Sequence, residues 1–303
     1  MESMDTTIII PSACRTERKD CILKAINSVL DSAYCSPCVV FIANGPHVDV
    51  ELLAYIATLE RVETKHLEKP SAPDAVKYGV EHCVHTKYFG FLDDDDYFLP
   101  HAISNRQIAL DYQPQYDVVI GQALRSNQGN LSRHMSDEQI ELCEHDPFGV
   151  IFKQKINWMT SSAGLYRTGS IGISYFQKNI SYFEWTYLAT KMLLSDVQFL
   201  FLTDPDHIIL DDNDNADDVS LSLSKTQKYA QYESAFMRAI KELPLNKEQR
   251  KMVAAKEADH FHDLAEKMRK SGRGKEALVH HLRSLRSPQG FMRYVLSTRH
   301  FVM

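Results

Sequence analysis

The 303-residue sequence lacks an apolar run long enough to span a bilayer. Its longest runs, such as Val39–Ala43 and Phe199–Leu202, fall far short of the ~20 residues that a spanning helix needs. The amino terminus has no basic segment followed by a long apolar core, so we expect no secretory signal. An excess of basic residues is also missing, because 34 Lys and Arg face 40 Asp and Glu. This balance excludes a generally basic coat for nucleic acid. The compartment that we expect for the protein is the cytoplasm.

Paired cysteine motifs are missing as well. The six cysteines stand at irregular spacings, and the CxxC pair Cys35 and Cys38 has no second pair to complete a zinc site. A redox site would need a thioredoxin-like context, which the sequence does not supply. Reduced thiols without a special role are therefore the favoured interpretation in the expected compartment.

The composition is that of a folded globular protein. Hydrophobic residues make up 44% and charged residues 24% of the chain, which excludes global disorder, and the length predicts about two domains. The first half alternates β-type runs with helical patterns. Strands are expected at 6–10, 38–43, 88–92 and 117–120, and helices at 21–30, 50–59, 74–83 and 101–112. This alternation predicts an α/β fold with a mostly parallel sheet flanked by helices.

The second half is less regular. We expect strands at 162–166, 197–202 and 207–210 and a helix at 183–195. Residues Asp204–Asp218 hold seven aspartates and no Lys or Arg, which predicts either a flexible loop or a lid over a site. From about Lys225 the pattern is helical. We therefore predict a catalytic domain over residues 1–224 and a helical extension over residues 225–303.

The most distinctive segment places four consecutive aspartates, Asp93 to Asp96, directly after an apolar strand and before Pro100. Four like charges repel one another unless positive charge lies among them. Hard cations such as Mg²⁺ and Mn²⁺ are often held by one or two carboxylates together with substrate phosphates. A single aspartate could cap the following helix, but four exceed what a cap requires. The segment therefore predicts a divalent-metal site.

Three motifs taken in order resemble those of the family 2 inverting nucleotide-sugar glycosyltransferases, which have the Rossmann-like GT-A fold. The resemblance covers about residues 6–222. The matching positions are Pro11-Ser12 with Arg18 and the helix end Ala25–Leu30, the strand end Asn44-Gly45-Pro46, and the metal segment Leu92–Asp96 with Pro100.

The resemblance implies a role for each matching residue. Asp93 and Asp95, the outer positions of the Asp-x-Asp motif, would hold Mn²⁺ or Mg²⁺ on the donor diphosphate. Asp94 would reach the donor ribose, and Asp96 would cap the following helix. The donor nucleotide, with uridine the commonest base in the family, would lie against Pro11, Ser12, Arg18 and Asn44.

Two positions depart from the family pattern. Ala43 replaces a carboxylate that often contacts the base, which leaves Asn44 to form hydrogen bonds there. The family segment Ala-Arg-Asn-x-Gly is represented by Ala75–Gly79, in which Lys77 is the available positive charge. Lys77 is either a donor-binding residue or a solvated helix lysine, and the sequence leaves both open.

A second chemical element is the segment Ser181–Leu188. Inverting transfer needs a base that takes the proton of the acceptor hydroxyl, and the family places an acidic pair before an aromatic residue here. Aligning Trp185 with that aromatic residue assigns the base to Glu184. Neighbouring aromatic side chains would raise the pKa of Glu184 by desolvation. The alternative is a carboxylate that only stabilises the first turn of a helix.

The C-terminal segment has a different charge. Between Ala265 and Met303 nine Lys and Arg face Glu266 and Glu276, a balance of about +7. An apolar stripe runs beside them, formed by Ala277, Leu278, His281, Leu282 and Leu285. Such a segment suits peripheral contact with an anionic membrane surface, or packing on the catalytic domain with a solvated basic face. Both interpretations stay open.

These features together predict a metal-dependent inverting glycosyltransferase. It would move a hexosyl or N-acetylhexosaminyl group from a nucleotide sugar to a hydroxyl of a glycan or lipid-linked acceptor, as in cell-surface polysaccharide synthesis. One alternative is a metal-dependent nucleotidyltransferase, although no Gly-rich or Lys-containing phosphate loop stands near Pro11. The other is a protein that binds sugars or cations without turnover.

Overall fold

The computed structural model describes residues 5–178, 180, 182–210 and 227–302. They fall into two compact units. A sheet unit comprises the described residues within Met1–His145, Trp158–Asn179 and Ser195–Ala216. A helical unit comprises those within Asp146–Asn157, Ile180–Leu194 and Asp217–Met303. The domain boundary predicted between residues 224 and 225 lies outside the described residues and stays a prediction.

The sheet unit contains all the strands that the described residues form. In chain order these are β1 (Thr6–Ser12), β2 (Cys38–Asn44), β3 (Val62–Leu67), β4 (Tyr88–Phe91), β5 (Tyr97–Phe98), β6 (Val118–Asn127), β7 (Asn130–Arg133), β8 (Gly164–Arg167) and β9 (Phe199–Leu210). Its helices are η1 (Thr16–Arg18), α1 (Lys19–Leu30), α2 (Val50–Ile56), α3 (Ala72–His82), α4 (Ala102–Tyr112), α5 (Asp137–His145), η2 (Ser161–Ala163) and η3 (Ile173–Phe176).

The sheet follows the order β3-β2-β1-β4-β8-β6-β9-β5, and β7 pairs with β6. Strands β1 to β4 are parallel to one another, whereas β8 runs antiparallel to both β4 and β6. The predicted α/β class is confirmed, but the sheet is mixed rather than mostly parallel. The strand order reverses between β1 and β4, so the carboxyl ends of these two strands form the switch point where ligands bind in such sheets.

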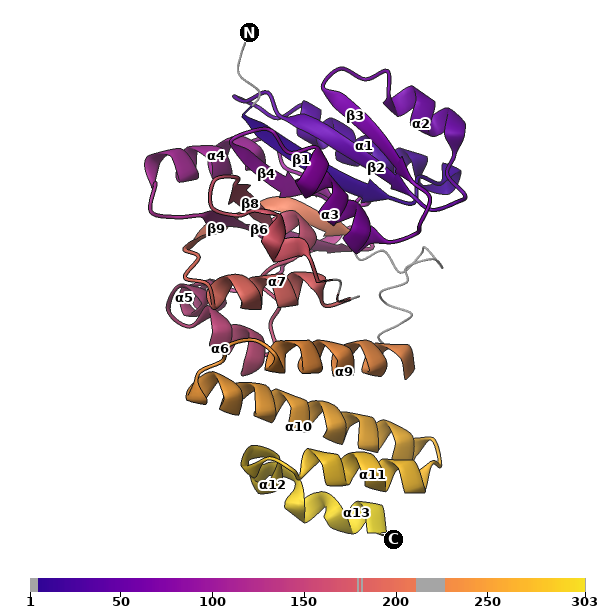
Figure 1. Cartoon of the computed structure of the whole chain (residues 1–303), viewed down its shortest axis with the longest axis vertical. Coiled ribbons are helices and arrows are strands. Elements are labelled where there is room, and N and C mark those ends of the chain that lie inside the picture. Colours follow the sequence, from indigo (N-terminus) through magenta and orange to yellow (C-terminus); the bar gives the residue numbers. More distant parts are fainter. Residues whose placement is uncertain (1–4, 179, 181, 211–226, 303) are drawn as a thin grey trace. The chain divides into compact units, whose positions relative to one another are not determined.

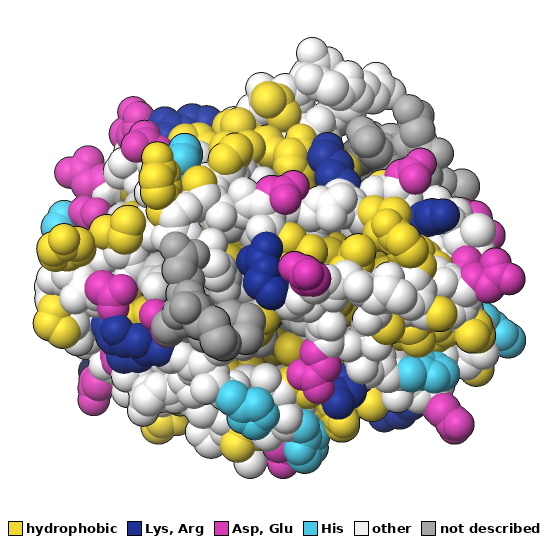
Figure 2. All heavy atoms as spheres, turned by 90° about the horizontal axis from the view of Figure 1, so that it is seen from above, with side chains coloured by type: hydrophobic (Ala, Val, Ile, Leu, Met, Phe, Trp, Pro, Cys, Tyr) yellow, Lys and Arg dark blue, Asp and Glu magenta, His cyan; other side chains and the backbone are white. Residues whose placement is uncertain are grey.

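Both faces of the parallel strands are buried, as their continuous apolar sequences require. Ile8 and Ile10 of β1 pack in one core cluster with α1, α2 and α4. Ile9 faces the opposite side, where α3 approaches so closely that a Cβ at Gly79 would lie 2.9 Å from the Ile9 side chain. Helices thus cover both faces (Figure 1). On the surface seen in Figure 2, acidic and basic side chains are interspersed with apolar ones.

Two expectations about the strands are wrong. Strand β3 is missed because its sequence, VETKHL, is mostly polar and its side chains are only partly buried. The two strands expected at 197–202 and 207–210 form one strand, β9, which includes Asp204 and Asp206. The first part of the expected acidic loop therefore belongs to a strand, with an irregular register against β6 near Pro205. Its remainder, 211–218, lies outside the described residues.

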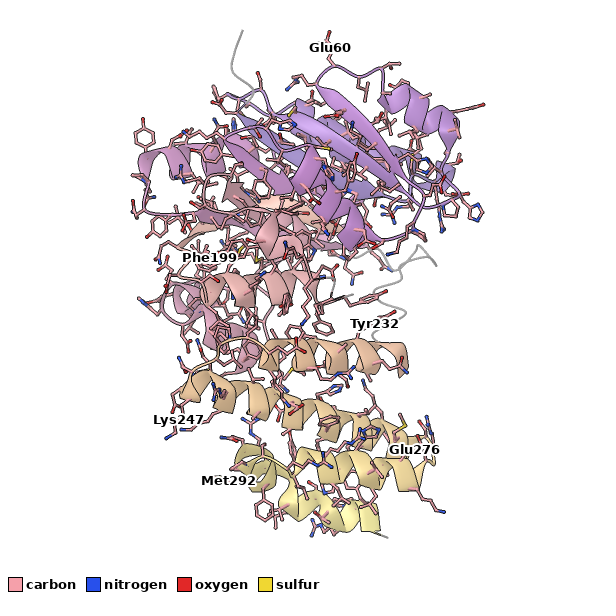
Figure 3. The ribbon with its side chains drawn as sticks, in the orientation of Figure 1. Glu60, Phe199, Tyr232, Lys247, Glu276 and Met292 are labelled. Atoms are coloured by element: carbon pink, nitrogen blue, oxygen red, sulfur yellow. The ribbon has the colours of Figure 1, made fainter. Side chains whose placement is uncertain are left out.

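The helical unit contains α6 (Pro147–Phe152), α7 (Glu184–Leu193), α9 (Gln227–Lys241), α10 (Lys247–Lys270), α11 (Gly274–Ser284), α12 (Pro288–Tyr294), η4 (Val295–Thr298) and α13 (Arg299–Val302). Helix α10 begins with a capping box between Asn246 and Gln249. Lys247 lies at its first residue, and Glu276 lies near the start of α11 (Figure 3). The prediction of helix beyond about Lys225 is confirmed for the described residues.

The buried face of α11 differs from the predicted apolar stripe. Ala277, His281 and Ser284 are buried, whereas Leu282 is 52% exposed. These three buried positions follow a spacing of four and three residues, which is one face of a helix. Leu282 lies outside that face and therefore belongs to the exposed surface.

Asp259 on α10 connects three parts of this unit. Its carboxylate accepts hydrogen bonds from Arg293 Nη1 at 2.7 and 2.9 Å and from Tyr294 Oη at 2.6 Å. Lys155 Nζ forms an ion pair with it at 3.0 Å. Burial raises the pKa of Asp259, but these donors outweigh burial and lower it overall. The carboxylate therefore remains ionised and fixes α12 on α10.

Candidate functional site

The four aspartates form the turn that joins β4 to β5. The turn closes on itself, because the Asp96 N–H donates to the Asp93 carbonyl at 3.1 Å. Its position at the carboxyl end of β4 places it beside the end of β1, at the point where the strand order reverses. This is the location that the α/β pattern predicts for a ligand site.

Arg18 lies between two of these carboxylates. Its Nη2 atom is 2.5 Å from Asp94 Oδ1 and 2.8 Å from Asp95 Oδ2. The other oxygen of Asp94 accepts a hydrogen bond from Ser12 Oγ at 2.5 Å. Burial raises the pKa of Asp94 to about 6, although Arg18 and Ser12 both act to lower it. The structure thus joins Ser12, Arg18, Asp94 and Asp95, four residues that the sequence singled out.

The ends of β1 and β2 continue this site. Pro11 and Ser12 pair with Ile42 and Ala43 in parallel register, and Asn44 Nδ2 donates to the Ser12 carbonyl at 3.1 Å. The next residue, Gly45, has a φ of +118°, a conformation that side chains other than glycine rarely adopt.

Cys14 also has a left-handed backbone, with a φ of +46°. Its N–H donates to Ser12 Oγ at 2.9 Å, so the strained turn holds the serine hydroxyl in place. Burial, with the charges of Asp49 and Asp94, raises the pKa of Cys14 to about 11. The thiol is therefore protonated and does not act as a nucleophile near neutral pH.

Asp93 and Asp96, the first and last aspartates of the turn, accept hydrogen bonds from two consecutive serines of η2. Ser161 Oγ donates to Asp93 Oδ2 at 2.5 Å, and Ser162 Oγ donates to Asp96 Oδ2 at 3.0 Å. The Leu210 N–H also donates to Asp96, at 3.2 Å. The prediction that Asp96 caps the next helix is wrong, since α4 has His101 at its N-cap position and no side-chain cap. Burial, and then the charges of Asp93 and Asp95, raise the pKa of Asp96 well above its usual range.

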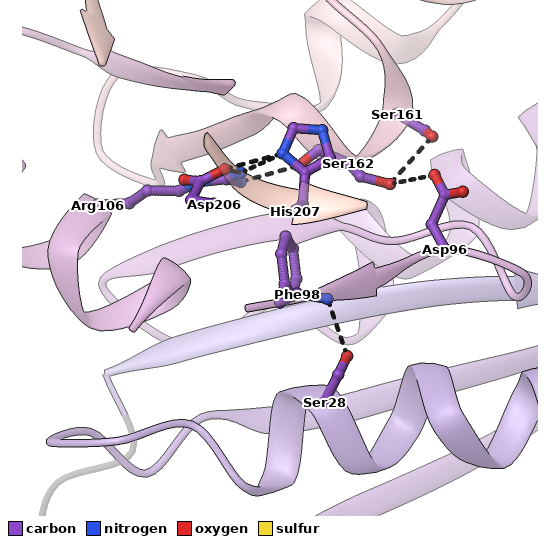
Figure 4. Close-up of polar contacts among 8 residues, drawn as sticks. All are labelled: Ser28, Asp96, Phe98, Arg106, Ser161, Ser162, Asp206 and His207. Carbon is purple, nitrogen blue, oxygen red and sulfur yellow. Dashed lines mark hydrogen bonds and ion pairs between the residues drawn. The ribbon is translucent and has the colours of Figure 1, made fainter. Parts of the chain in front are cut away.

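A buried ion pair lies next to Ser162 (Figure 4). Arg106 Nε and Nη2 donate to the two carboxylate oxygens of Asp206 at 2.6 and 2.7 Å, and Nη1 donates to the Ser162 carbonyl at 2.8 Å. Asp206 Oδ1 also lies 2.8 Å from His207 Nδ1. Burial raises the pKa of Asp206, but the partners lower it overall. Arg106 therefore connects β9 to the segment that holds the aspartate turn.

Two predicted residues are not part of this hydrogen-bond network. Lys77 is half-buried on α3, and the described residues offer it no ion-pair partner. Glu184 is the first residue of α7 in the helical unit. It follows Tyr182, whose φ of +67° is strained for a side chain of that size.

The burial and hydrogen bonding of the Glu184 carboxylate are unusual for an ionisable group. Its Oε2 atom is buried, and no described residue forms a hydrogen bond with it. Burial raises the pKa of Glu184 to about 7, while the backbone N–H groups of Glu184 and Tyr182 act to lower it. A carboxylate with these properties can accept a proton near neutral pH.

The aspartate turn also fits a hard cation. No group of three or more His, Cys, Asp and Glu side chains in the described part of the chain could hold a metal by itself. Two carboxylates suffice, however, where substrate phosphates supply the remaining ligands. The charges of Asp93 and Asp95 raise the pKa of the neighbouring Asp96, so negative charge is in excess here. The donor set and its charge therefore suit Mg²⁺ or Mn²⁺.

A family model decides the identity of the chain. The model described as glycosyl transferase family 2 matches residues 7–173, which include the β1 end, the aspartate turn and both serines of η2. The chain belongs to glycosyl transferase family 2. No curated protein sequence matches it. None of the described helices has the length and apolarity of a membrane-spanning segment.

Solved structures similar to this family 2 glycosyltransferase include TarS 1–349 from S. aureus. It matches with a TM-score of 0.61 at 11% identity, covering 98% of this chain and 89% of that one. The same protein in complex with UDP-GlcNAc gives a TM-score of 0.66 at 11% identity, and its complex with UDP gives 0.60 at 12% identity, both with the same coverage. At these identities the likeness is one of fold, and it confirms the GT-A prediction.

Sequence analysis missed Ser161, Ser162 and Arg106. The serines lie 68 and 66 residues from the aspartates that they hold, and a pair of serines in an irregular segment has no chemical signature. A signal for Arg106 was present in the acidic segment, because a buried Asp206 in a strand requires a positive partner.

Proposed function

We propose that this glycosyltransferase takes its sugar from a UDP-sugar, with a hexosyl or N-acetylhexosaminyl group, and transfers it with inversion to a hydroxyl of a glycan or lipid-linked acceptor. The observation that carries the proposal is the joining of Ser12, Arg18, Asp94 and Asp95 at the switch point of the sheet. The similar fold of TarS in its UDP and UDP-GlcNAc complexes supports the choice of donor. Membership of family 2 favours this activity over nucleotidyl transfer.

The donor would lie against the ends of β1 and β2, where Pro11, Ser12 and Asn44 line the surface, with Lys77 as a further candidate. Asp93 and Asp95 would hold Mn²⁺ or Mg²⁺, which neutralises charge on the departing diphosphate. Arg18 supplies a fixed positive charge beside them.

Glu184 acts as the base in this proposal. The acceptor oxygen forms a bond to the anomeric carbon on the face opposite the diphosphate. The bond from that carbon to the diphosphate oxygen breaks, and Glu184 takes the hydroxyl proton. The buried, unbonded Oε2 and the raised pKa of Glu184 support this role.

The exposed basic residues of the C-terminal helices support a peripheral membrane location for the acceptor. Some basic residues of this segment are already paired, namely Arg269 with Glu266, Arg273 with Glu276, and Arg293 with Asp259. Others, such as Lys275 and Arg299, are exposed and available to anionic headgroups.

Calorimetry with UDP in the presence and absence of Mn²⁺ tests the metal and donor site. Asp95→Asn should remove the gain in UDP affinity that Mn²⁺ gives to the unchanged protein. Asp137→Asn is the matched control, because Asp137, like Asp95, is an aspartate whose carboxylate pairs with one arginine. Retention of the full Mn²⁺-dependent gain by Asp95→Asn would show that the metal site lies elsewhere.

A further inference from the structure

A groove crosses the helical unit, with α10 as its floor and α9 and α11 as its walls. Its volume is about 430 Å³, which is within the usual range of small-molecule sites. Phe261, Leu264 and Met268 of α10 form an apolar floor, and Met237 of α9 adds to it. The groove can therefore cover the apolar part of a ligand.

One arginine lines the groove from each wall, Arg238 from α9 and Arg283 from α11. Neither forms an ion pair with a described residue. The guanidinium of Arg283 lies over the ring of Phe261, 5.7 Å from its centroid. This contact orients the arginine but leaves its charge uncompensated.

The acidic residues of the groove are already neutralised. Lys241 Nζ binds both carboxylate oxygens of Glu257 at 2.5 Å, and Arg273 pairs with Glu276. The charges of Arg238 and Arg283 thus remain in excess, which favours an anion.

His280 adds an unfilled hydrogen-bonding position. Its Nδ1 atom is buried, and no described residue bonds to it. Burial, and then the charges of Arg283 and His260, lower the pKa of His280, whereas the charge of Glu276 acts to raise it.

We propose that this groove binds a phosphate group, with Arg238 and Arg283 as its ligands. A phosphate carries more acceptor oxygens than a carboxylate, and they point in more directions, so it can bind two arginines from opposite walls. Val279 and Leu282 flank Arg283 on α11 and are 50% and 52% exposed. Apolar surface beside a phosphate site suits a phospholipid headgroup, and a free phosphate is the other source of the same chemistry.

Cosedimentation with vesicles tests the headgroup source, using phosphatidylglycerol mixed with phosphatidylcholine and phosphatidylcholine alone. Arg238→Gln and Arg283→Gln should each lower partition onto the anionic vesicles by about fivefold. Arg286→Gln is the matched control, because Arg286 is an exposed arginine in the turn just after α11 and does not line the groove. It should lower partition by less than about twofold at about 0.15 M salt, because the attraction between the membrane and a charge outside the groove is screened. An equal loss with Arg286→Gln would overturn the groove in favour of a diffuse basic face.

Titration with inorganic phosphate tests the free source. The ring signals of His280, followed by nuclear magnetic resonance, should shift saturably in the unchanged protein and in Arg286→Gln but not in Arg283→Gln. Such a shift without vesicle binding assigns the groove to a soluble phosphate, and vesicle binding that depends on both arginines assigns it to a headgroup. Absence of both effects overturns the proposal. Equal melting temperatures of all variants exclude misfolding as the cause.

Discussion

Arg106 binds Asp206 through two hydrogen bonds, of 2.6 and 2.7 Å, inside the sheet unit. The arginine side chain is 1% exposed, so this pair is removed from water. The same guanidinium holds the Ser162 carbonyl, and the Ser162 hydroxyl holds Asp96. A core ion pair is thus linked through one residue to the aspartate turn.

Arg106→Met should lower the free energy of unfolding of the sheet unit. It leaves the carboxylate of Asp206 buried without its main partner, a change that costs about 3–5 kcal/mol. Arg133→Gln is the control, because its ion pair with Asp137 is exposed and contributes at most about 1 kcal/mol. Urea unfolding of both variants measures the difference. Similar midpoints for the two variants would contradict a structural role for the buried pair.

Ser161→Ala should weaken metal binding without disturbing the fold. The hydroxyl bonds to Asp93, a proposed metal ligand, and loss of such an outer partner typically lowers metal affinity by about 10–100-fold. Ser28→Ala is the matched control, since Ser28 Oγ accepts from the Phe98 N–H at the other end of the turn (Figure 4). Mn²⁺ titration in the presence of UDP compares the two. Equal affinities in both variants would remove Ser161 from the site.

The sequence was sufficient to locate the aspartate turn because its charges are consecutive and follow an apolar strand. The resemblance to family 2 also singled out Ser12, at the end of β1, and Arg18, in η1. Contacts that join distant segments could not be predicted in this way. Asp204-Pro205-Asp206 has the composition of a turn, yet these residues belong to β9 because Arg106 compensates the buried charge of Asp206. The sequence of α4 likewise does not show that Arg106 is buried, because this burial depends on Asp206, a partner 100 residues away.

Gly290→Ala should destabilise the helical unit. A Cβ at this position would overlap the backbone oxygen of Ser284 and lie 2.6 Å from the Ala258 side chain, so α12 would have to move away from α10. Overpacking of this kind costs about 1–3 kcal/mol. At Gly274, the first residue of α11, an added Cβ meets nothing within 4 Å, so Gly274→Ala is the control and should be neutral. Thermal unfolding separates them, and equal melting temperatures would exclude the close approach.

Glu184→Gln should lower turnover by about 10²–10⁴-fold, the usual contribution of general-base catalysis. The amide keeps the size of the side chain but cannot accept the proton. Because the base form is the carboxylate and its pKa is about 7, kcat/KM of the unchanged protein should rise with pH through about 7 and then level off. The rise should vanish in Glu184→Gln, whereas UDP affinity should stay the same. Turnover within a few-fold of the unchanged protein would place the base elsewhere.

The raised pKa of Glu184 also predicts how the stability of the protein depends on pH. The pKa of Glu184 is raised from 4.5 to about 7 in the folded protein, so between these values the folded state binds more protons than the unfolded state. Its contribution to stability is present below about pH 4.5 and is lost as the pH rises through about 7. Glu184→Gln carries no such charge and should gain stability relative to the unchanged protein between pH 5 and pH 8. Glu184→Asp, which retains a carboxylate, is the control and should keep the loss. The free energy of unfolding of each protein is measured with urea across this pH range. The same pH dependence in all three proteins would contradict the burial of an ionisable Glu184.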